Sequence, residues 1–331
     1  MNVAMWAKAL RIIPRISKEE WLKLDVISRW LISTRAAVLI MTFISAAIAG
    51  LLAARAGQFN LGAWLLLVLG LVFAHATNNL LNDLTDYERG VDQDNYFRAQ
   101  YGPHAIQQGL MTKREMLVYA GVTGLIALAA GLPLVLSRGL PALYLLLAGA
   151  VFVLFYTWPL KYIGLGEIAV IIVWGPLMIG GGYFVITGQW DWNVVLAGLP
   201  YALGTTTVIY GKHIDKLDAD KAKGIRTLPV IIGDKAARFS VRVMIALMYL
   251  LVIGLVISGY FSPLMLVVLG ALWYARHPWK LFGAPRPTEP PASHKDIWPM
   301  WFVASAFVHN RAYGMLFLLG LILDVIVKLA F

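Results

Sequence analysis

The strongest constraint on this chain is a series of apolar stretches, each close to the length that crosses a membrane. A transmembrane helix needs about 20 predominantly apolar residues. The chain has 331 residues, and nine stretches approach this requirement, at 31–54, 61–81, 116–137, 140–158, 165–187, 194–210, 239–258, 263–274 and 312–330. The eighth stretch is short and residues 298–308 are ambiguous, which leaves a range of eight to ten spans. Only 14% of the residues are charged, against about 25% in an ordinary soluble domain. We therefore predict an all-helical membrane bundle of about nine transmembrane helices.

Lysine and arginine are distributed unevenly between the two sides of this arrangement. One side holds 24 of these residues, the other holds only Arg55, Arg138 and Lys328, and Arg35 lies inside the first stretch. Cytoplasmic loops of membrane proteins carry an excess of Lys and Arg. We therefore predict a multi-pass protein of the cell membrane with a cytoplasmic N-terminus and a C-terminus outside. The net charge of +10 then reflects topology, and we expect no nucleic-acid partner.

Residues 1–29 form a basic segment ahead of the first span. They interleave Lys and Arg with apolar residues and lack the short apolar core and cleavage site of a signal peptide. We expect an amphipathic helix on the cytoplasmic surface. No composition break divides residues 30–331, so we expect a single membrane domain there, surrounded by lipid and without an obligate protein partner. The chain contains no Cys, which excludes disulfides, thiolate metal sites and Cys nucleophiles.

The first acidic cluster, residues 78–92, follows the second span. If that span stays helical to its end, Asn79, Asn82, Asp83 and Asp86 recur at steps of three and four residues and share one face. Two carboxylates on one face repel each other unless a cation lies between them. Mg²⁺ prefers such oxygen ligands and usually binds through one or two carboxylates together with substrate phosphates. The cluster therefore predicts a Mg²⁺ site, although a solvated helix end with an Asn or Asp cap is the simpler alternative.

The second acidic cluster, residues 212–226, follows the sixth span and repeats this arrangement. Asp220 precedes Gly224 by four residues, as Asp86 precedes Gly90. Two apolar helices that end in acids on one side of the membrane predict a site between them, where Mg²⁺ bridges a diphosphate. The alternating Lys and Asp residues are also compatible with a solvated face of salt bridges.

Two basic residues stand near the same side of the membrane. Lys161 lies in the short connection after the fourth span, and Arg35 lies near the start of the first span. Both are candidates for binding an anion, and both are equally compatible with side chains that snorkel to the interface. The chain has no phosphate-binding loop, no HExxH motif and no nucleophile elbow, and its six His are scattered.

These residues resemble the UbiA superfamily of intramembrane prenyltransferases. The first cluster and the residues after it are similar to the branch that prenylates dihydroxynaphthoate in menaquinone synthesis, through Asn82-Asp83-x2-Asp86-x3-Gly90-x-Asp92 and Gly102-Pro103-x2-Ile106-Gln107-x-Gly109-x2-Thr112. The similarity continues through Tyr156-x4-Lys161-Tyr162-x-Gly164-x-Gly166-Glu167, Trp174-Gly175-Pro176 and Asp220-x3-Gly224-Ile225-x-Thr227-Leu228-Pro229. It covers about residues 29–330.

The resemblance implies a bundle around a central polar cavity that opens to the cytoplasm and to lipid. It implies an enzyme that transfers a polyprenyl group from a polyprenyl diphosphate to a small aromatic or quinone-precursor acceptor, with dihydroxynaphthoate as one candidate. By similarity the cofactor is Mg²⁺, the catalytic residues and metal ligands are Asp83, Asp86, Asp215 and Asp220, and Asn82 is a further metal ligand. The substrate-binding residues implied in the same way are Arg35, Asn79, Asn82, Tyr156, Lys161, Lys212 and Arg226.

The second motif departs from the family pattern. Family members normally carry acids eight and four residues before the Gly, but the eighth position here is Lys216, with Asp215 before it and Asp218 after it. Asp215 and Asp220 would point about 140° apart on a regular helix. We expect a π-bulge to bring Asp215 back toward Asp220, whereas on a regular helix Asp218 would replace it. The family run Asn-Asn-x-Arg-Asp is also replaced, by Gly211-Lys212-His213-Ile214-Asp215, which leaves diphosphate binding intact but allows an acceptor other than naphthoate.

Two other functions fit the same residues. The acceptor can be a glycerol phosphate lipid, as in some members of the superfamily, and Lys212 with His213 favours a phosphate or carboxylate on the acceptor. A transporter with an intramembrane polar site is the third alternative. Transporters break their helices near the bilayer midplane, whereas these acids lie at helix ends.

Overall fold

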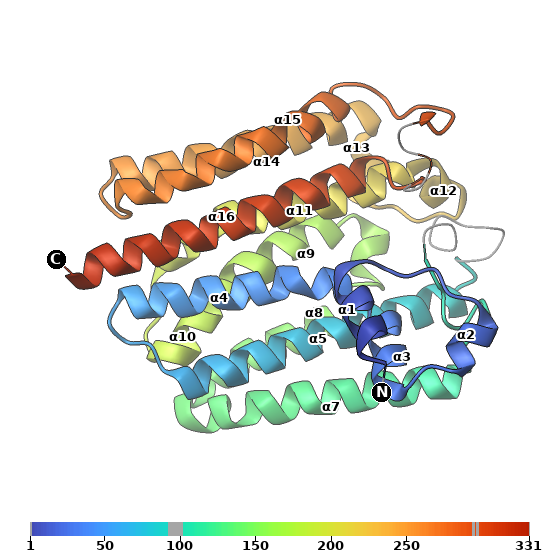
Figure 1. Cartoon of the computed structure of the whole chain (residues 1–331), viewed down its shortest axis with the longest axis horizontal. Coiled ribbons are helices and arrows are strands. Elements are labelled where there is room, and N and C mark those ends of the chain that lie inside the picture. Colours follow the sequence, from blue (N-terminus) through green and yellow to red (C-terminus); the bar gives the residue numbers. More distant parts are fainter. Residues whose placement is uncertain (1, 92–101, 293–294, 296–297, 331) are drawn as a thin grey trace.

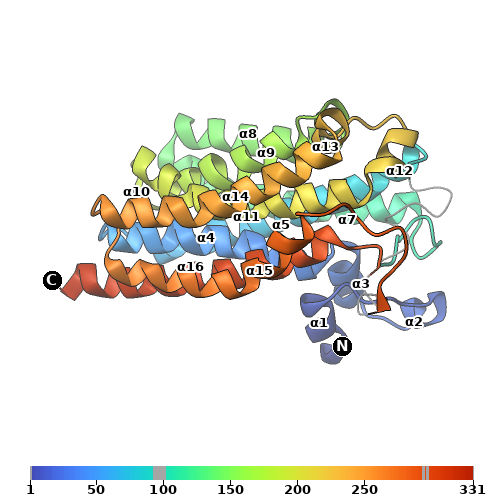
Figure 2. The same cartoon turned by 90° about the horizontal axis from the view of Figure 1, so that it is seen from above.

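The computed structural model describes residues 2–91, 102–292, 295 and 298–330, so Asp92 of the first motif lies outside the described residues. Within these ranges all of the regular secondary structure is helical. The elements are α1 (Val3–Arg11), α2 (Lys18–Leu22), α3 (Val26–Ser33), η1 (Ala36–Val38), α4 (Leu39–Arg55), α5 (Leu61–Glu88), α7 (Lys113–Arg138), α8 (Leu140–Phe155), η2 (Leu160–Ile163), α9 (Gly166–Ile172), η3 (Val173–Gly180), α10 (Gly181–Thr187), α11 (Trp192–Asp215), α12 (Leu217–Ala222), α13 (Leu228–Ile232), α14 (Asp234–Ile257), η4 (Pro263–Ala271), α15 (Leu272–Leu281) and α16 (Phe302–Ala330). The long helices lie side by side with nearly parallel axes, and the C-terminus lies at the opposite end from α1, α2 and α12 (Figures 1 and 2).

The membrane bundle is confirmed, while the count of nine spans stays a prediction. Seven of the described helical stretches are long and apolar enough to cross a membrane: Ala36–Arg55, Leu61–Glu88, Lys113–Arg138, Gly166–Thr187, Trp192–Asp215, Asp234–Ile257 and Phe302–Leu329. The eighth candidate, α8, is apolar but shorter. The remaining predicted span corresponds to η4 and α15, where Arg276, His277 and Lys280 make the second half polar.

The helix ends follow from local sequence. α7 begins at a capping box, in which the Thr112 hydroxyl accepts the Glu115 N–H and the Glu115 carboxylate accepts the Thr112 N–H. α7 ends at Arg138, and Gly139 follows it with a φ of 70° that turns the chain directly into α8. The π-helical segment η3 contains Pro176, which has no N–H to donate to the hydrogen bond of a regular α-helix.

The sixth span, α11, lies at the centre and packs against α4, α9, η3, α14 and α16.

The start of the first span was predicted wrongly. The first span does not run unbroken from residue 31, because α3 ends at Ser33 and Arg35 adopts a left-handed conformation with φ 55° before η1 and α4. The basic segment contains the amphipathic helix α1, and the side chains of Ser17 and Asp25 then cap α2 and α3. Trp21 is 2% exposed and packs with α5 and α7 residues, so this segment is part of the bundle's packed end.

Candidate active site

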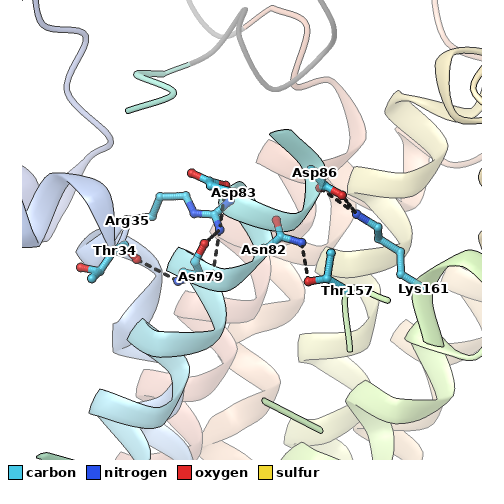
Figure 3. Close-up of polar contacts among 8 residues, drawn as sticks. All are labelled: Thr34, Arg35, Asn79, Asn82, Asp83, Asp86, Thr157 and Lys161. Atoms are coloured by element: carbon cyan, nitrogen blue, oxygen red, sulfur yellow. Dashed lines mark hydrogen bonds and ion pairs between the residues drawn. The ribbon is translucent and has the colours of Figure 1, made fainter. Parts of the chain in front are cut away.

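Asn79 and Asp83 on α5 face Arg35 (Figure 3). The Arg35 Nη2 atom lies 3.4 Å from Oδ1 of Asp83 and donates to the side-chain and backbone oxygens of Asn79, each at 3.1 Å. The Asn79 amide donates to the Thr34 carbonyl at 2.8 Å. Among the described residues, Arg35 is the only residue other than Gly with a positive φ. Left-handed backbone costs about 1–2 kcal/mol, and these contacts hold Arg35 in it with the cation directed at the first motif.

Asn82 and Asp86 form the neighbouring row of the same helix face (Figure 3). Lys161 in η2 donates to both carboxylate oxygens of Asp86, at 2.7 and 2.8 Å. The Asn82 amide donates to the Thr157 hydroxyl at 2.9 Å, and its carbonyl oxygen points away from that bond as an acceptor. The four first-motif residues therefore lie on one helix face, as predicted. They form two pairs, Asn79 with Asp83 and Asn82 with Asp86, in which the members are four residues apart, and each pair contacts different partners.

The second motif is not arranged as predicted. α11 ends at Asp215 and α12 begins at Leu217, so the chain contains neither the predicted π-bulge nor a continuous helix at this point. The Asp215 carboxylate accepts the backbone N–H of Phe302 at 2.9 and 3.0 Å and that of Val303 at 2.9 Å. It also lies 4.0 Å from Arg286. Asp215 therefore caps the positive N-terminus of α16, where unpaired N–H groups attract a carboxylate, and it does not face Asp220.

Asp220 pairs instead with Lys216. The Lys216 ammonium donates to Oδ1 of Asp220 at 2.9 Å, and the two side chains are 5% and 0% exposed. Asp218 is exposed, so it does not replace Asp215 either. Sequence reasoning missed Lys216 as a site residue, although its place at the eighth position before Gly224 was the signal that could have found it.

The two motifs meet beside η2. Lys223 donates to the Gly90 carbonyl at 3.3 Å, and Val91 and Ile225 pack in one small buried cluster. Burial lowers the pKa of Lys161 and the Asp86 carboxylate opposes this shift, while the charges of Lys216 and Asp220 act on the same ammonium. The structure therefore brings Asp86 and Asp220 into one charged neighbourhood.

A cavity of about 1160 Å³ adjoins this neighbourhood. Its polar end contains Arg35, Asn78, Asn79, Asn82, Tyr156 and Lys212. Its walls are mostly apolar side chains from the bundle helices, among them Leu71, Leu128, Leu146, Val173 and Phe307. The predicted polar cavity is therefore lined mostly by apolar side chains, and Asp83, Asp86, Asp220 and Lys161 are buried without lining it.

Arg226 is the one predicted substrate-binding residue that stands apart. Its side chain is exposed and does not line the cavity, and its backbone N–H donates to the Tyr162 carbonyl at 3.3 Å.

A second buried pair, also missed by the sequence reasoning, is formed by His213 and Glu167. Nδ1 of His213 is 2.5 Å from Glu167, which also accepts the Leu228 N–H. This pair ties α11 to α9 and α13.

The residues present fit Mg²⁺ by donor type but do not form a ready-made cage. Asn82, Asp83, Asp86 and Asp220 offer the hard oxygens that Mg²⁺ prefers. In the described part of the chain, however, no three His, Asp or Glu side chains are gathered closely enough to hold a metal. Each of the three Asp side chains is already paired with a basic residue.

Comparison with solved structures shows the same fold. The UbiA homologue from Aeropyrum pernix K1 matches with a TM-score of 0.61 at 19% identity, over 87% of this chain and 98% of that chain. The UbiA homologue from Archaeoglobus fulgidus bound to GPP and Mg²⁺ matches with a TM-score of 0.59 at 16% identity, over 87% and 99%.

Comparison with curated sequences gives distant relatives. The chain is 26% identical to the UbiA prenyltransferase domain-containing protein 1 homolog of Drosophila melanogaster, over 55% of this chain and 51% of that protein, and thus spans about half of that relative's length. It is 25% identical to the 1,4-dihydroxy-2-naphthoate octaprenyltransferase of Bacillus subtilis, over 71% of this chain and 76% of that protein. The sequence profile of the UbiA prenyltransferase family matches residues 43–321. This chain belongs to the UbiA prenyltransferase family.

Proposed function

We propose that this protein transfers a prenyl group from a prenyl diphosphate to an aromatic or quinone-precursor acceptor within the membrane, with Mg²⁺ as cofactor. The observation that carries the proposal is a large, mostly apolar cavity whose polar lining includes Arg35, Asn79, Asn82 and Lys212, with the buried carboxylates of Asp83, Asp86 and Asp220 close by but not lining it. Apolar walls suit a prenyl chain, and the charged end suits a diphosphate. The cavity of about 1160 Å³ exceeds the usual ligand site of about 300–1,000 Å³, which leaves room for an acceptor beside the chain.

The chain's own residues divide the work at this end. Asp83 and Asp86, with the Asn82 carbonyl oxygen, would hold Mg²⁺, which when bound would supply positive charge to the departing diphosphate. Asp220 lies beside them, paired with Lys216. Asp215 is left out of this set because the start of α16 occupies its carboxylate.

Basic side chains stabilise the leaving group in this proposal. As the allylic C–O bond breaks, its electron pair leaves with the diphosphate, and the growing negative charge is met by Arg35, Lys161 and Lys216. The apolar walls exclude water, which would otherwise convert the allylic cation into an alcohol. The new bond then forms to the electron-rich carbon of the acceptor, and the proton displaced from that carbon passes to the released diphosphate.

An acidic group on the acceptor is favoured by the cavity wall. Lys212, Arg11, Arg15 and Arg311 line the cavity, and none of its described lining residues is Asp or Glu. A carboxylate on an aromatic acceptor fits this wall, and so does the phosphate of a glycerol phosphate lipid, which we keep as the second candidate. The name of the Bacillus subtilis relative supports the aromatic acid. The transporter alternative is not kept for two reasons. The acidic residues lie near helix ends rather than at the middle of the bundle, and the chain belongs to a family of prenyltransferases.

The test is a product assay with an acceptor panel. Purified protein receives geranylgeranyl diphosphate, Mg²⁺, and either dihydroxynaphthoate, hydroxybenzoate or a glycerol phosphate lipid, and the products are weighed by mass spectrometry. We expect a prenylated aromatic product that disappears with EDTA. A prenylated glycerol phosphate lipid alone would establish the second candidate, and no product with any acceptor would overturn the proposal.

A matched substrate tests the role of Lys212. Lys212→Met should weaken the use of dihydroxynaphthoate about tenfold or more, since a charge-assisted contact is lost. It should change little with naphthalenediol, which lacks the carboxylate. Equal losses with both acceptors would show that Lys212 does not contact the acidic group.

We also place the active site on the cytoplasmic side of the cell membrane. The supporting observation is that the site lies at the end of the bundle where the basic N-terminal segment packs (Figure 2).

A further inference from the structure

The three buried Asp side chains of the candidate active site are each matched by an internal cation. Arg35 lies 3.4 Å from Asp83, Lys161 lies 2.7 Å from Asp86, and Lys216 lies 2.9 Å from Asp220. All six side chains are at most 11% exposed. Buried ions are costly unless they are paired, so the charges of these three carboxylates are already matched before any ligand enters.

The second motif contributes fewer carboxylates than its sequence offers. It contains Asp215, Asp218 and Asp220, but the first of these caps α16 and the second is exposed. Only Asp220 remains beside the first motif, and Lys216 lies against it. A Mg²⁺ ion at the second motif would therefore have one protein carboxylate and an ammonium group as its neighbours.

We infer that this site binds the diphosphate with a single Mg²⁺ ion, and that the Lys216 ammonium stands where a second ion would otherwise be held by Asp220. The inference rests on the proposed function, since it assumes a Mg²⁺-dependent diphosphate site. The single ion belongs to the first motif, where Asn82, Asp83 and Asp86 lie on one helix face (Figure 3). Lys216 is then a positioning and charge-balancing residue for the second motif.

Counting bound Mn²⁺ tests the inference without measuring turnover. Mn²⁺ replaces Mg²⁺ as a paramagnetic probe, and the free ion is measured by electron paramagnetic resonance while purified protein is titrated in the presence of the unreactive analogue geranylgeranyl thiolodiphosphate. We expect one tightly bound Mn²⁺ per chain in the wild-type protein. Two in the wild type would overturn the inference, while none at all would instead overturn the proposed Mg²⁺-dependent function.

Substitution of Lys216 should create the second metal site. Lys216→Asp adds a carboxylate beside Asp220 and removes the ammonium, so we expect two bound Mn²⁺. Lys216→Asn, which adds a neutral oxygen without a charge, serves as a second variant if Lys216→Asp does not fold, and should also take up a second ion. Lys221→Asp is the matched control, because Lys221 is exposed on α12, the short helix that carries Asp220, and it should keep one ion. A count that stays at one in both Lys216 variants would overturn the role of Lys216.

Discussion

Asp215→Asn separates a structural carboxylate from a metal ligand. The Asp215 side chain is fully buried and accepts the N–H groups of Phe302 and Val303, which join the end of α11 to the start of α16. The Asn variant keeps one acceptor oxygen but turns an NH₂ group toward the same donors and removes the charge at the helix N-terminus. Loss of a helix cap costs about 0.5–2 kcal/mol, and a hydrogen bond to a charged group contributes about 1.5–3 kcal/mol. We therefore expect a loss of about 2 kcal/mol in the free energy of unfolding.

The assay measures unfolding and metal binding on the same sample. The unfolding entropy is about 2.1 cal/mol/K per residue, so in this chain of 331 residues a loss of about 2 kcal/mol should lower Tm in detergent by about 3 °C. Its affinity for Mn²⁺ should stay within about threefold of wild type, because no metal ligand is removed. Asp218→Asn is the control and should change neither quantity, since Asp218 is exposed. An Asp215→Asn protein with an unchanged Tm and no Mn²⁺ binding would refute the capping role and restore the metal-ligand interpretation.

Three further predictions concern activity and topology. Asp86→Asn removes a carboxylate held by Lys161 and should lower turnover about a hundredfold while the protein stays monodisperse; wild-type turnover would contradict the metal site. Gly149 lines the cavity and a Cβ there meets no atom within 4 Å, so Gly149→Leu should project into the cavity and lower the use of geranylgeranyl relative to geranyl diphosphate about tenfold, measured as a ratio of kcat/KM. A Cys at the exposed position of Lys223 should react with an impermeant thiol reagent only after the cytoplasmic face is opened, and labelling of intact cells would contradict the predicted orientation.

The first motif was predictable because its geometry is local. Asn79, Asn82, Asp83 and Asp86 lie on one continuous helix, so their spacing alone places them together. Their partners were less accessible to sequence reasoning. Lys161 was a candidate for binding an anion, but its distance of 2.7 Å from Asp86 depends on how η2 packs against α5, which no local pattern encodes.

The second motif was not predictable for the same physical reason. The groups that hold Asp215 belong to α16, 87 and 88 residues later in the chain. A carboxylate at the end of an apolar helix looks the same in sequence whether it binds a metal or caps a distant helix. The family pattern favoured the metal, whereas the unpaired N–H groups of α16 decided the outcome.

The interruption of the helix at Lys216 lets two adjacent residues contact different parts of the molecule. On a continuous helix, the side chains of Asp215 and Lys216 would point about 100° apart around the helix axis. Because α11 ends at Asp215 and α12 begins at Leu217, each side chain reaches a separate partner. Asp215 fixes the start of α16, and Lys216 fixes Asp220 at the candidate active site. α16 also forms one wall of the cavity, through Val303 and Phe307. Because Asp215 and Lys216 are adjacent in the chain, a shift of α16 that moves Asp215 should also move Lys216 relative to Asp220. Changes at the start of α16 should therefore alter diphosphate affinity as well as stability, even though α16 supplies none of the Asp residues of the site.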